Sequence, residues 1–176
     1  MKNRLLLAAS LVLGLALRAP AAERPQMANP SIDMAGHLRV SDEAARHRQT
    51  HRVSEAEFIR MSRQPGTVIL DARSREKYDE LHVKGAVNLS FPDFTFVSLH
   101  TLLPDKSTRI LIYCNNNFRE GVPAFPTKAI SSALNLSTFI ALYDYGYREV
   151  YELAPLLDVA SSNLQFEGRA AAERAR

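Results

Sequence analysis

The stretch RILIYCNNNFREG, residues 109–121, decides how this chain is expected to fold. It opens with an apolar run of strand length, residues 109–113, and continues with Cys114, the single cysteine of the chain, and Arg119. A buried strand followed by such a loop and a helix is typical of an anion-binding cradle, because successive backbone N–H groups point inward and the helix adds its positive N-terminal end. A thiol there loses its proton easily and becomes a nucleophile. A cysteine at a strand end is also often a small buried apolar residue, and this stretch alone leaves both interpretations open.

Residues 1–21 have the pattern of a secretory signal peptide. A basic start is followed by an apolar run over 5–17 and by small residues at the end, which is the usual order of such leaders. We predict cleavage after Ala21, with Ala22 as the alternative, and hence an exported protein that is periplasmic or secreted. The apolar run is short for a bilayer span, so no stable membrane insertion is expected after cleavage. An uncleaved membrane anchor is the alternative.

Removal of this leader makes the chain formally neutral. The full chain has 22 Lys and Arg against 19 Asp and Glu; Lys2, Arg4 and Arg18 lie in the leader, which holds no acid, so 19 of each sign remain. This balance gives no support to a nucleic-acid partner. An exported chain with one cysteine cannot form an internal disulfide, and this favours a thiol that is either buried or used.

The remaining chain divides into three parts. Residues 22–51 are predicted to be a lead-in with a short polar helix over 41–49. Residues 52–168 are predicted to form one domain, and residues 169–176 a disordered tail. His47 and His51 have the spacing of metal ligands on a helix, but no third ligand lies nearby, so we expect a solvated helix face, no metal and no cofactor.

The domain alternates strands and helices. Ser54 and Glu57 form a capping box that starts a helix ended by Pro65 and Gly66. Short apolar runs predict strands over 67–71, 86–90, 109–113 and 149–153, and helices are expected over 74–78, 94–103, 127–133 and 137–145. The fold class is therefore α/β, with a central, mostly parallel sheet of about five strands and helices on both faces.

Four segments together resemble a rhodanese-like domain. VILDARSREKY over 68–78 is similar to a strand-Asp-x-Arg-Ser-x-x-Glu-aromatic element of that family, and HVKGAVNL over 82–89 to its His-x-x-Gly-Ala-x-Asn element. Residues 114–119 fall where the family has its active-site loop, and YGYREV over 145–150 resembles the entry to its closing strand. The resemblance covers about residues 52–168 and implies a rhodanese-like fold.

The resemblance also implies a sulfurtransferase. In the family a cysteine thiolate, here Cys114, attacks the outer sulfur of a donor such as thiosulfate, holds it as a persulfide and passes it to a thiol or other thiophilic acceptor. The partners implied are a small sulfur-containing anion as the donor and a protein thiol as a candidate acceptor. The expected substrate-binding residues are Asn115, Asn116, Asn117, Phe118 and Arg119, with Phe118 at the pocket mouth and the Arg119 fork on the donor oxygens.

The length and content of the loop keep two alternatives open. Four residues separate Cys114 from Arg119, as in sulfurtransferases, whereas related cysteine phosphatases have five. The Asn-rich interior, Glu120 and the prolines at 123 and 126 depart from the family pattern. A binding or sensing module without turnover is therefore the main alternative, and a phosphatase the lesser one.

Three further residues are expected to support the structure. Asp71 and Arg73 are predicted to form a buried pair or to bind loop backbone, and His82 to orient the chain before Gly85.

Overall fold

A computed structural model describes residues 29–174 of the 176-residue chain. The predicted signal peptide, residues 1–21, lies outside the described residues, and so does the first part of the lead-in through residue 28. Residues from Asp33 onward form one compact unit, which is described here.

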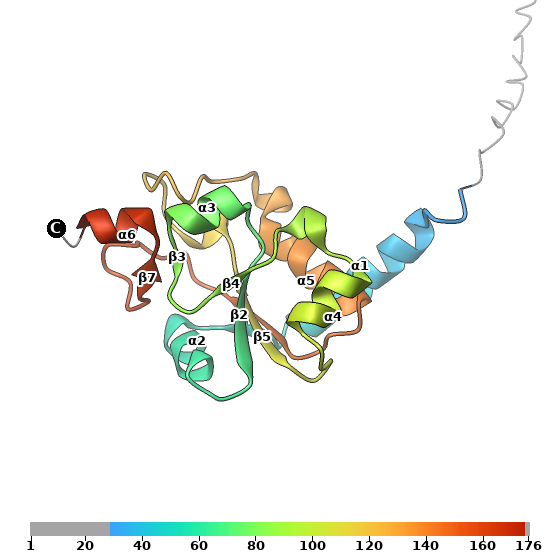
Figure 1. Cartoon of the computed structure of the whole chain (residues 1–176). Coiled ribbons are helices and arrows are strands. Elements are labelled where there is room, and N and C mark those ends of the chain that lie inside the picture. Colours follow the sequence, from blue (N-terminus) through green and yellow to red (C-terminus); the bar gives the residue numbers. More distant parts are fainter. Residues whose placement is uncertain (1–28, 175–176) are drawn as a thin grey trace, which may run out of the picture. The chain divides into compact units, whose positions relative to one another are not determined.

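A five-stranded parallel sheet forms the centre of this unit (Figure 1). Its strands, in spatial order, are β1 (Arg52–Val53), β6 (Val150–Leu153), β5 (Arg109–Tyr113), β2 (Thr67–Asp71) and β4 (Val87–Asn88). All four pairings are parallel. The three longest strands are rich in β-branched and other apolar residues because both faces of the sheet are covered. The predicted α/β class and strand number are confirmed.

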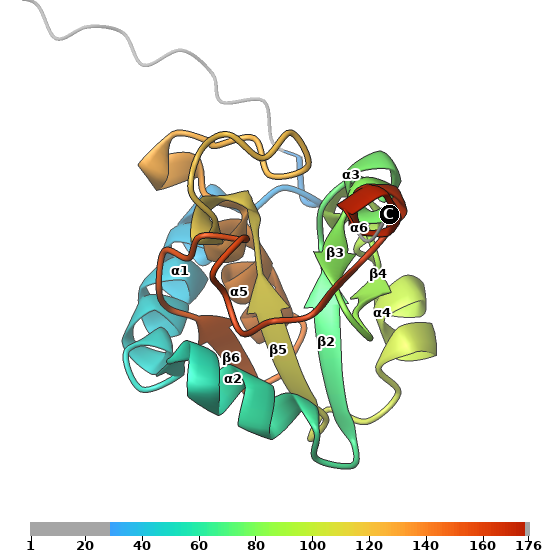
Figure 2. The ribbon, with the colours of Figure 1, turned by 90° about the vertical axis from the view of Figure 1, so that its left-hand side faces the viewer.

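Helices cover both faces of the sheet. On one face α2 (Glu55–Ser62) buries Phe58 and Met61 against Leu111. The other face is covered by three helices, α1 (Met34–Arg48), α4 (Phe96–Leu102) and α5 (Leu134–Asp144). In Figure 2, α2 crosses in front of the sheet and α5 lies behind it. The short α3 (Arg75–Glu80) follows β2 and is capped by Ser74.

A second, two-stranded sheet joins distant parts of the chain. β3 (His82–Val83) pairs antiparallel with β7 (Phe166–Glu167), and α6 (Arg169–Arg174) follows directly. The prediction of a disordered tail over 169–176 is therefore wrong for residues 169–174. The reason is burial: Ala170 and Ala171 pack against the core on the α2 face, and Gly168, at φ +121°, allows the chain to turn between strand and helix.

Two of the predicted helices differ from the structure. α1 begins at Met34 rather than residue 41, because the side chain of Asp33 caps it by accepting the Gly36 N–H. The helix predicted over 127–133 is only a 3₁₀ turn, η3 (Ile130–Ser132). Ile130 is 88% exposed, so this segment has no apolar contact that would support a full helix. α5 starts at Leu134, with Asn135 inside its first turn. Phe91–Asp93 forms another 3₁₀ turn, η1.

Candidate functional site

Cys114 lies directly after β5, the middle strand of the sheet. Its side chain is 1% exposed. Because side chains alternate along a strand, Cys114 is on the same side as Ile112, which belongs to the core covered by α1, α4 and α5. The thiol therefore belongs to the interior of the molecule on that face.

A cavity of about 180 Å³ opens beside the thiol. Its lining comes from the end of α1, the start of β1, the last part of β6, the turn after Cys114, η3 and the start of α5. Its polar lining residues are Arg48, Arg52, Asn116, Asn117, Asn135 and Glu152, and its apolar ones include Ile130 and Leu136. The opening is thus partly charged, although the thiol itself is buried.

Backbone N–H groups converge on the Cys114 sulfur. They come from Asn135 and Leu134 at the N-terminus of α5, and from Asn116 in the turn after β5. Burial nevertheless raises the pKa of the Cys114 thiol above its ordinary value; the three N–H groups lower this pKa, and the carboxylate of Glu152 raises it further. The effect of burial on this pKa is larger than that of the N–H groups, so the thiol is mostly protonated at neutral pH.

Asn117 fixes the turn after Cys114. Its Oδ1 accepts the Cys114 N–H at 2.9 Å and the Asn135 side-chain amide at 3.0 Å, while its own amide donates to the Leu153 carbonyl at 2.7 Å. These bonds use the side chain of Asn117 to join β5, β6 and α5. Within the described part of the chain, the buried Oδ1 of Asn135 has no partner, so one acceptor at this cavity is unsatisfied.

The other two asparagines lie on different sides of the turn, η2 (Asn115–Asn117). Asn116 lines the Cys114 cavity, and its side chain exchanges two hydrogen bonds with the Lys128 backbone, at 2.8 and 3.1 Å. Asn115 instead lines a neighbouring hollow of about 320 Å³, together with Arg73 and Lys128. The structure therefore brings Asn116 and Asn117, but not Asn115, to the cavity beside the thiol.

Phe118 and Arg119 are not at this cavity, and the prediction that they form its mouth and anion fork is corrected. Phe118 is buried in the opposite core, with its ring 4.1 Å from that of Phe125. Its backbone is extended and forms a parallel bridge to Leu157. Burial of Phe118 therefore leads the chain away from the thiol. Arg119 is exposed, and its N–H donates to the Leu157 carbonyl at 2.8 Å.

Arg48, Arg52 and Glu152 are site residues that the sequence analysis missed. Glu152 is 4% exposed and pairs in register with Ile112, so its side chain is on the Cys114 face. Arg48 donates to both of its carboxylate oxygens, through Nε and, at 2.7 Å, through Nη2. An acid inside the apolar strand predicted over 149–153 signals a buried ion pair, because a lone buried charge is unfavourable. That signal does not identify the partner, which lies about 100 positions away in sequence.

The predicted supporting residues lie on the other side of the sheet. Asp71 and Arg73 form a buried ion pair at 2.6 Å, and the Arg73 guanidinium also donates to the carbonyls of Ala124 and Leu81. The Tyr113 hydroxyl donates to Asp71 as well. His82 stacks on Tyr78, with ring centroids 3.8 Å apart, and its Nδ1 contacts the Tyr78 carbonyl at 2.7 Å.

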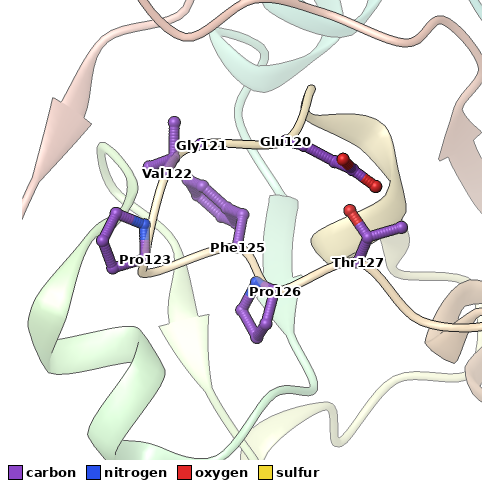
Figure 3. Close-up of a pocket in the computed structure, with 7 residues that line it drawn as sticks. All are labelled: Glu120, Gly121, Val122, Pro123, Phe125, Pro126 and Thr127. Atoms are coloured by element: carbon purple, nitrogen blue, oxygen red, sulfur yellow. The ribbon is translucent and has the colours of Figure 1, made fainter.

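The segment after Arg119 forms a separate hollow of about 410 Å³. Figure 3 shows that its lining comes from one stretch of chain, Glu120 to Thr127. Phe125 is buried beneath it. None of these lining residues is a cysteine, serine or histidine, so the segment that contains Pro123 and Pro126 shapes a surface hollow rather than the thiol site.

Residues 29–174 contain neither a membrane-spanning helix nor a cluster of metal-ligating side chains. No helix there is long and apolar enough to cross a membrane, and no group of three His, Cys, Asp or Glu side chains is arranged to hold a metal ion. His47 and His51 stack at 3.9 Å, and they contact the backbone carbonyls of Arg148 and His47, respectively.

Comparison with known proteins identifies the family. The BH2092 protein from Bacillus halodurans is similar in structure, with a TM-score of 0.50 and 22% identity over 75% of this chain and 89% of that chain. Thiosulfate sulfurtransferase from Pseudomonas aeruginosa has a TM-score of 0.47 and 20% identity, over 79% of this chain and 26% of that chain. A rhodanese from E. coli, solved with anions, has a TM-score of 0.39 and 22% identity, over 58% of this chain and 99% of that chain. No curated protein matches the chain. The family model of the rhodanese-like domain matches residues 54–153, more than half of the chain, and the protein therefore belongs to the rhodanese-like domain family.

Proposed function

We propose that this protein is a sulfurtransferase in which Cys114 carries sulfane sulfur as a persulfide. The observation that carries the proposal is the position of the thiol. It follows the middle strand of a sulfurtransferase-type fold, adjoins a cavity and faces three backbone N–H groups. Such donors stabilise a sulfur anion.

The reaction consists of two exchanges of one sulfur atom. The Cys114 thiolate attacks the outer sulfur of a small anionic donor such as thiosulfate; a new S–S bond forms as the donor's S–S bond breaks, and sulfite leaves with the electron pair. The thiolate of an acceptor then attacks the outer sulfur of the persulfide and carries it away, and Cys114 leaves as the thiolate. No net oxidation takes place.

The backbone N–H groups matter most after the first step. A persulfide is a stronger acid than a thiol, and its terminal sulfur extends away from the buried Cys114 side chain into the cavity. The N–H groups of Leu134 and Asn135 at the start of α5 add the positive end of the helix dipole near this anion. We therefore expect the site to stabilise the loaded form better than the unloaded thiolate.

Intact-mass measurement tests the proposal. The mature protein is incubated with thiosulfate and, separately, with an alkyl persulfide, then desalted and weighed. We expect the addition of one sulfur atom, its absence in Cys114→Ala, and its removal by excess thiol. Failure of both donors to add sulfur to folded protein would sink the proposal.

A binding or sensing module without turnover is the second candidate. Two observations favour it: burial raises the pKa of Cys114, and Arg119 is exposed at a distance from the cavity rather than forming an anion fork with the thiol loop. In that case the mass experiment would show no adduct, while thiosulfate would still raise the melting temperature in proportion to its binding. Export to the periplasm or the medium remains part of the proposal and rests on the leader sequence.

A further inference from the structure

The positive charge at the Cys114 cavity comes from outside the cysteine loop. Arg48 is the last residue of α1 and Arg52 the first residue of β1, and both line the cavity. The family model matches residues 54–153, so both arginines precede the matched segment. Glu152 is the carboxylate in the same lining.

Arg48 is committed to Glu152. The pair is bidentate, and its side chains are 25% and 6% exposed. A buried carboxylate next to a thiol opposes formation of the thiolate, and a cation bound to that carboxylate cancels most of this effect. Loss of Arg48 alone would leave Glu152 buried with its charge unbalanced.

Arg52 keeps its charge available. Among the described residues, its side chain makes one hydrogen bond, of 3.4 Å, to the carbonyl of Ala154. No ion pair formed within residues 29–174 includes it. Since Arg48 and Glu152 neutralise each other, the lining retains one net positive charge, and Arg52 carries it at the exposed rim.

We propose that Arg52 is the anion-binding residue of the Cys114 site and that Arg48 is a positioning residue, which holds Glu152 in a neutral pair beside the thiol. The segment that joins α1 to β1 is thereby a working part of the site, and it takes small anions over neutral molecules of the same shape. The inference rests on the proposed function only in identifying the anion as a sulfur donor.

Two alkylating reagents of similar size test the role of Arg52. Iodoacetate is an anion and iodoacetamide is neutral, and both transfer carbon to Cys114 with loss of iodide. In Arg52→Gln the ratio of the iodoacetate to the iodoacetamide rate should fall by about three- to tenfold, as expected for one partly screened charge. Added salt should lower the wild-type ratio in the same direction.

Two other arginines make this experiment decisive. Arg39→Gln changes an exposed charge on α1 that is paired with Glu43, and it should leave the rate ratio unchanged. Arg119→Gln tests the competing source of charge. An unchanged ratio in Arg52→Gln, or an equal fall in Arg119→Gln, would overturn the assignment.

The pH dependence of iodoacetamide alkylation tests Arg48. Arg48→Met should move the reactive range of Cys114 to higher pH, and Glu152→Gln should move it to lower pH. Arg48→Lys should remain near the wild type, because it keeps the charge. If Arg48→Met does not fold, the comparison of Glu152→Gln with the double variant Arg48→Met/Glu152→Gln decides. Glu152→Gln leaves the Arg48 cation beside the thiol and should move the reactive range to lower pH, whereas the double variant removes the neutral pair as a whole and should stay near the wild type. Equal shifts in the two variants would show that the charge of Arg48 does not act on the thiol.

The outcomes separate this inference from the proposed function. The role of the pair would be contradicted if the reactive pH range of Cys114 moved in the same direction in Arg48→Met and Glu152→Gln, or if it did not move in Glu152→Gln. None of the alkylation measurements requires sulfur transfer. A protein that shows the expected rate ratios but gains no sulfur from any donor would retain this anion site and lose the proposed turnover.

Discussion

The thiol of Cys114 is predicted to react slowly at neutral pH. Burial raises its pKa above the ordinary value, so the rate of iodoacetamide alkylation should still be rising above about pH 8.5, where a free cysteine is half ionised. Intact-mass kinetics between pH 6 and 10 measure this. A plateau reached below pH 8 would instead indicate a depressed pKa, which is what an anion cradle built on the cysteine loop alone would produce.

The raised pKa of Cys114 also makes the stability of the fold depend on pH. Above about pH 8.5 the unfolded chain loses the thiol proton, whereas the folded chain keeps it to higher pH because burial raises the pKa of Cys114. The unfolded state then binds fewer protons, so the free energy of unfolding falls as the pH rises from there. Cys114→Ala should lack this contribution, which urea titrations at pH 8 and pH 10 can detect.

The buried pair of Asp71 and Arg73 supports the opposite side of the sheet. Asp71→Asn leaves the guanidinium of Arg73 buried without a counter-charge and should lower the free energy of unfolding by about 3 kcal/mol. Arg75→Gln is the matched control, because it removes an exposed pair with Asp79 and should change the free energy by at most about 0.5 kcal/mol. Equal losses in urea denaturation of the two variants would refute the importance of burial.

At the scale of elements, the turn between β7 and α6 depends on Gly168. Its φ of +121° disfavours any side chain, and a Cβ there would lie 2.7 Å from the Glu80 carbonyl oxygen. Gly168→Ala should therefore destabilise the protein by about 2–3 kcal/mol and release α6. Gly66→Ala shares the positive φ, at +75°, but its Cβ would meet nothing within 4 Å. The free energy of unfolding of Gly66→Ala should therefore fall by only about 1–2 kcal/mol.

Proteolysis and thermal denaturation check this pair of variants. The expected result is early cleavage near residue 168 in Gly168→Ala, no early cleavage at that position in Gly66→Ala, and the larger fall in melting temperature in Gly168→Ala. If both variants lose the same stability, the contact with Glu80 contributes nothing.

The two long central strands could be predicted from the sequence with their bounds, but the two-residue strands β3 and β7 could not. The strands over 67–71 and 109–113 have the predicted bounds, because each is an apolar, β-branched run between turn residues. β3 and β7 have two residues each and pair across more than 80 positions, so no local pattern reveals them. The helix expected over 127–133 failed because Ile130, the residue that should anchor it, faces solvent.

The candidate site was predictable only in part, for a related reason. Local motifs place Cys114 directly after the strand over 109–113, and the structure puts it there; that this strand is the middle one of the sheet is known only from the structure. The side chains around it depend on tertiary contacts instead. Phe118 is buried in the opposite core, and the following Arg119 therefore does not line the cavity. Arg48, at the end of α1, binds Glu152 although its segment carries no motif of the family.

For the whole molecule, the leader predicts a change of charge on export. Cleavage after Ala21 removes three basic residues and no acid, so the net charge should fall from +3 to zero. N-terminal sequencing and intact mass of protein secreted by a suitable host should give Ala22 as the first residue. Recovery of the full-length chain from the membrane fraction would support the uncleaved anchor instead.

The depth of Cys114 limits which molecules can exchange sulfur with it. The thiol is 1% exposed and opens on a cavity of about 180 Å³, which is room for a few non-hydrogen atoms and not for a protein surface. In the proposed reaction the outer sulfur of the persulfide lies inside this cavity, so a cysteine on the flat face of a folded partner would not reach it. A protein acceptor must therefore present its thiol on a narrow projection, such as a chain terminus or a loop tip, and a small diffusible thiol meets the same requirement without one.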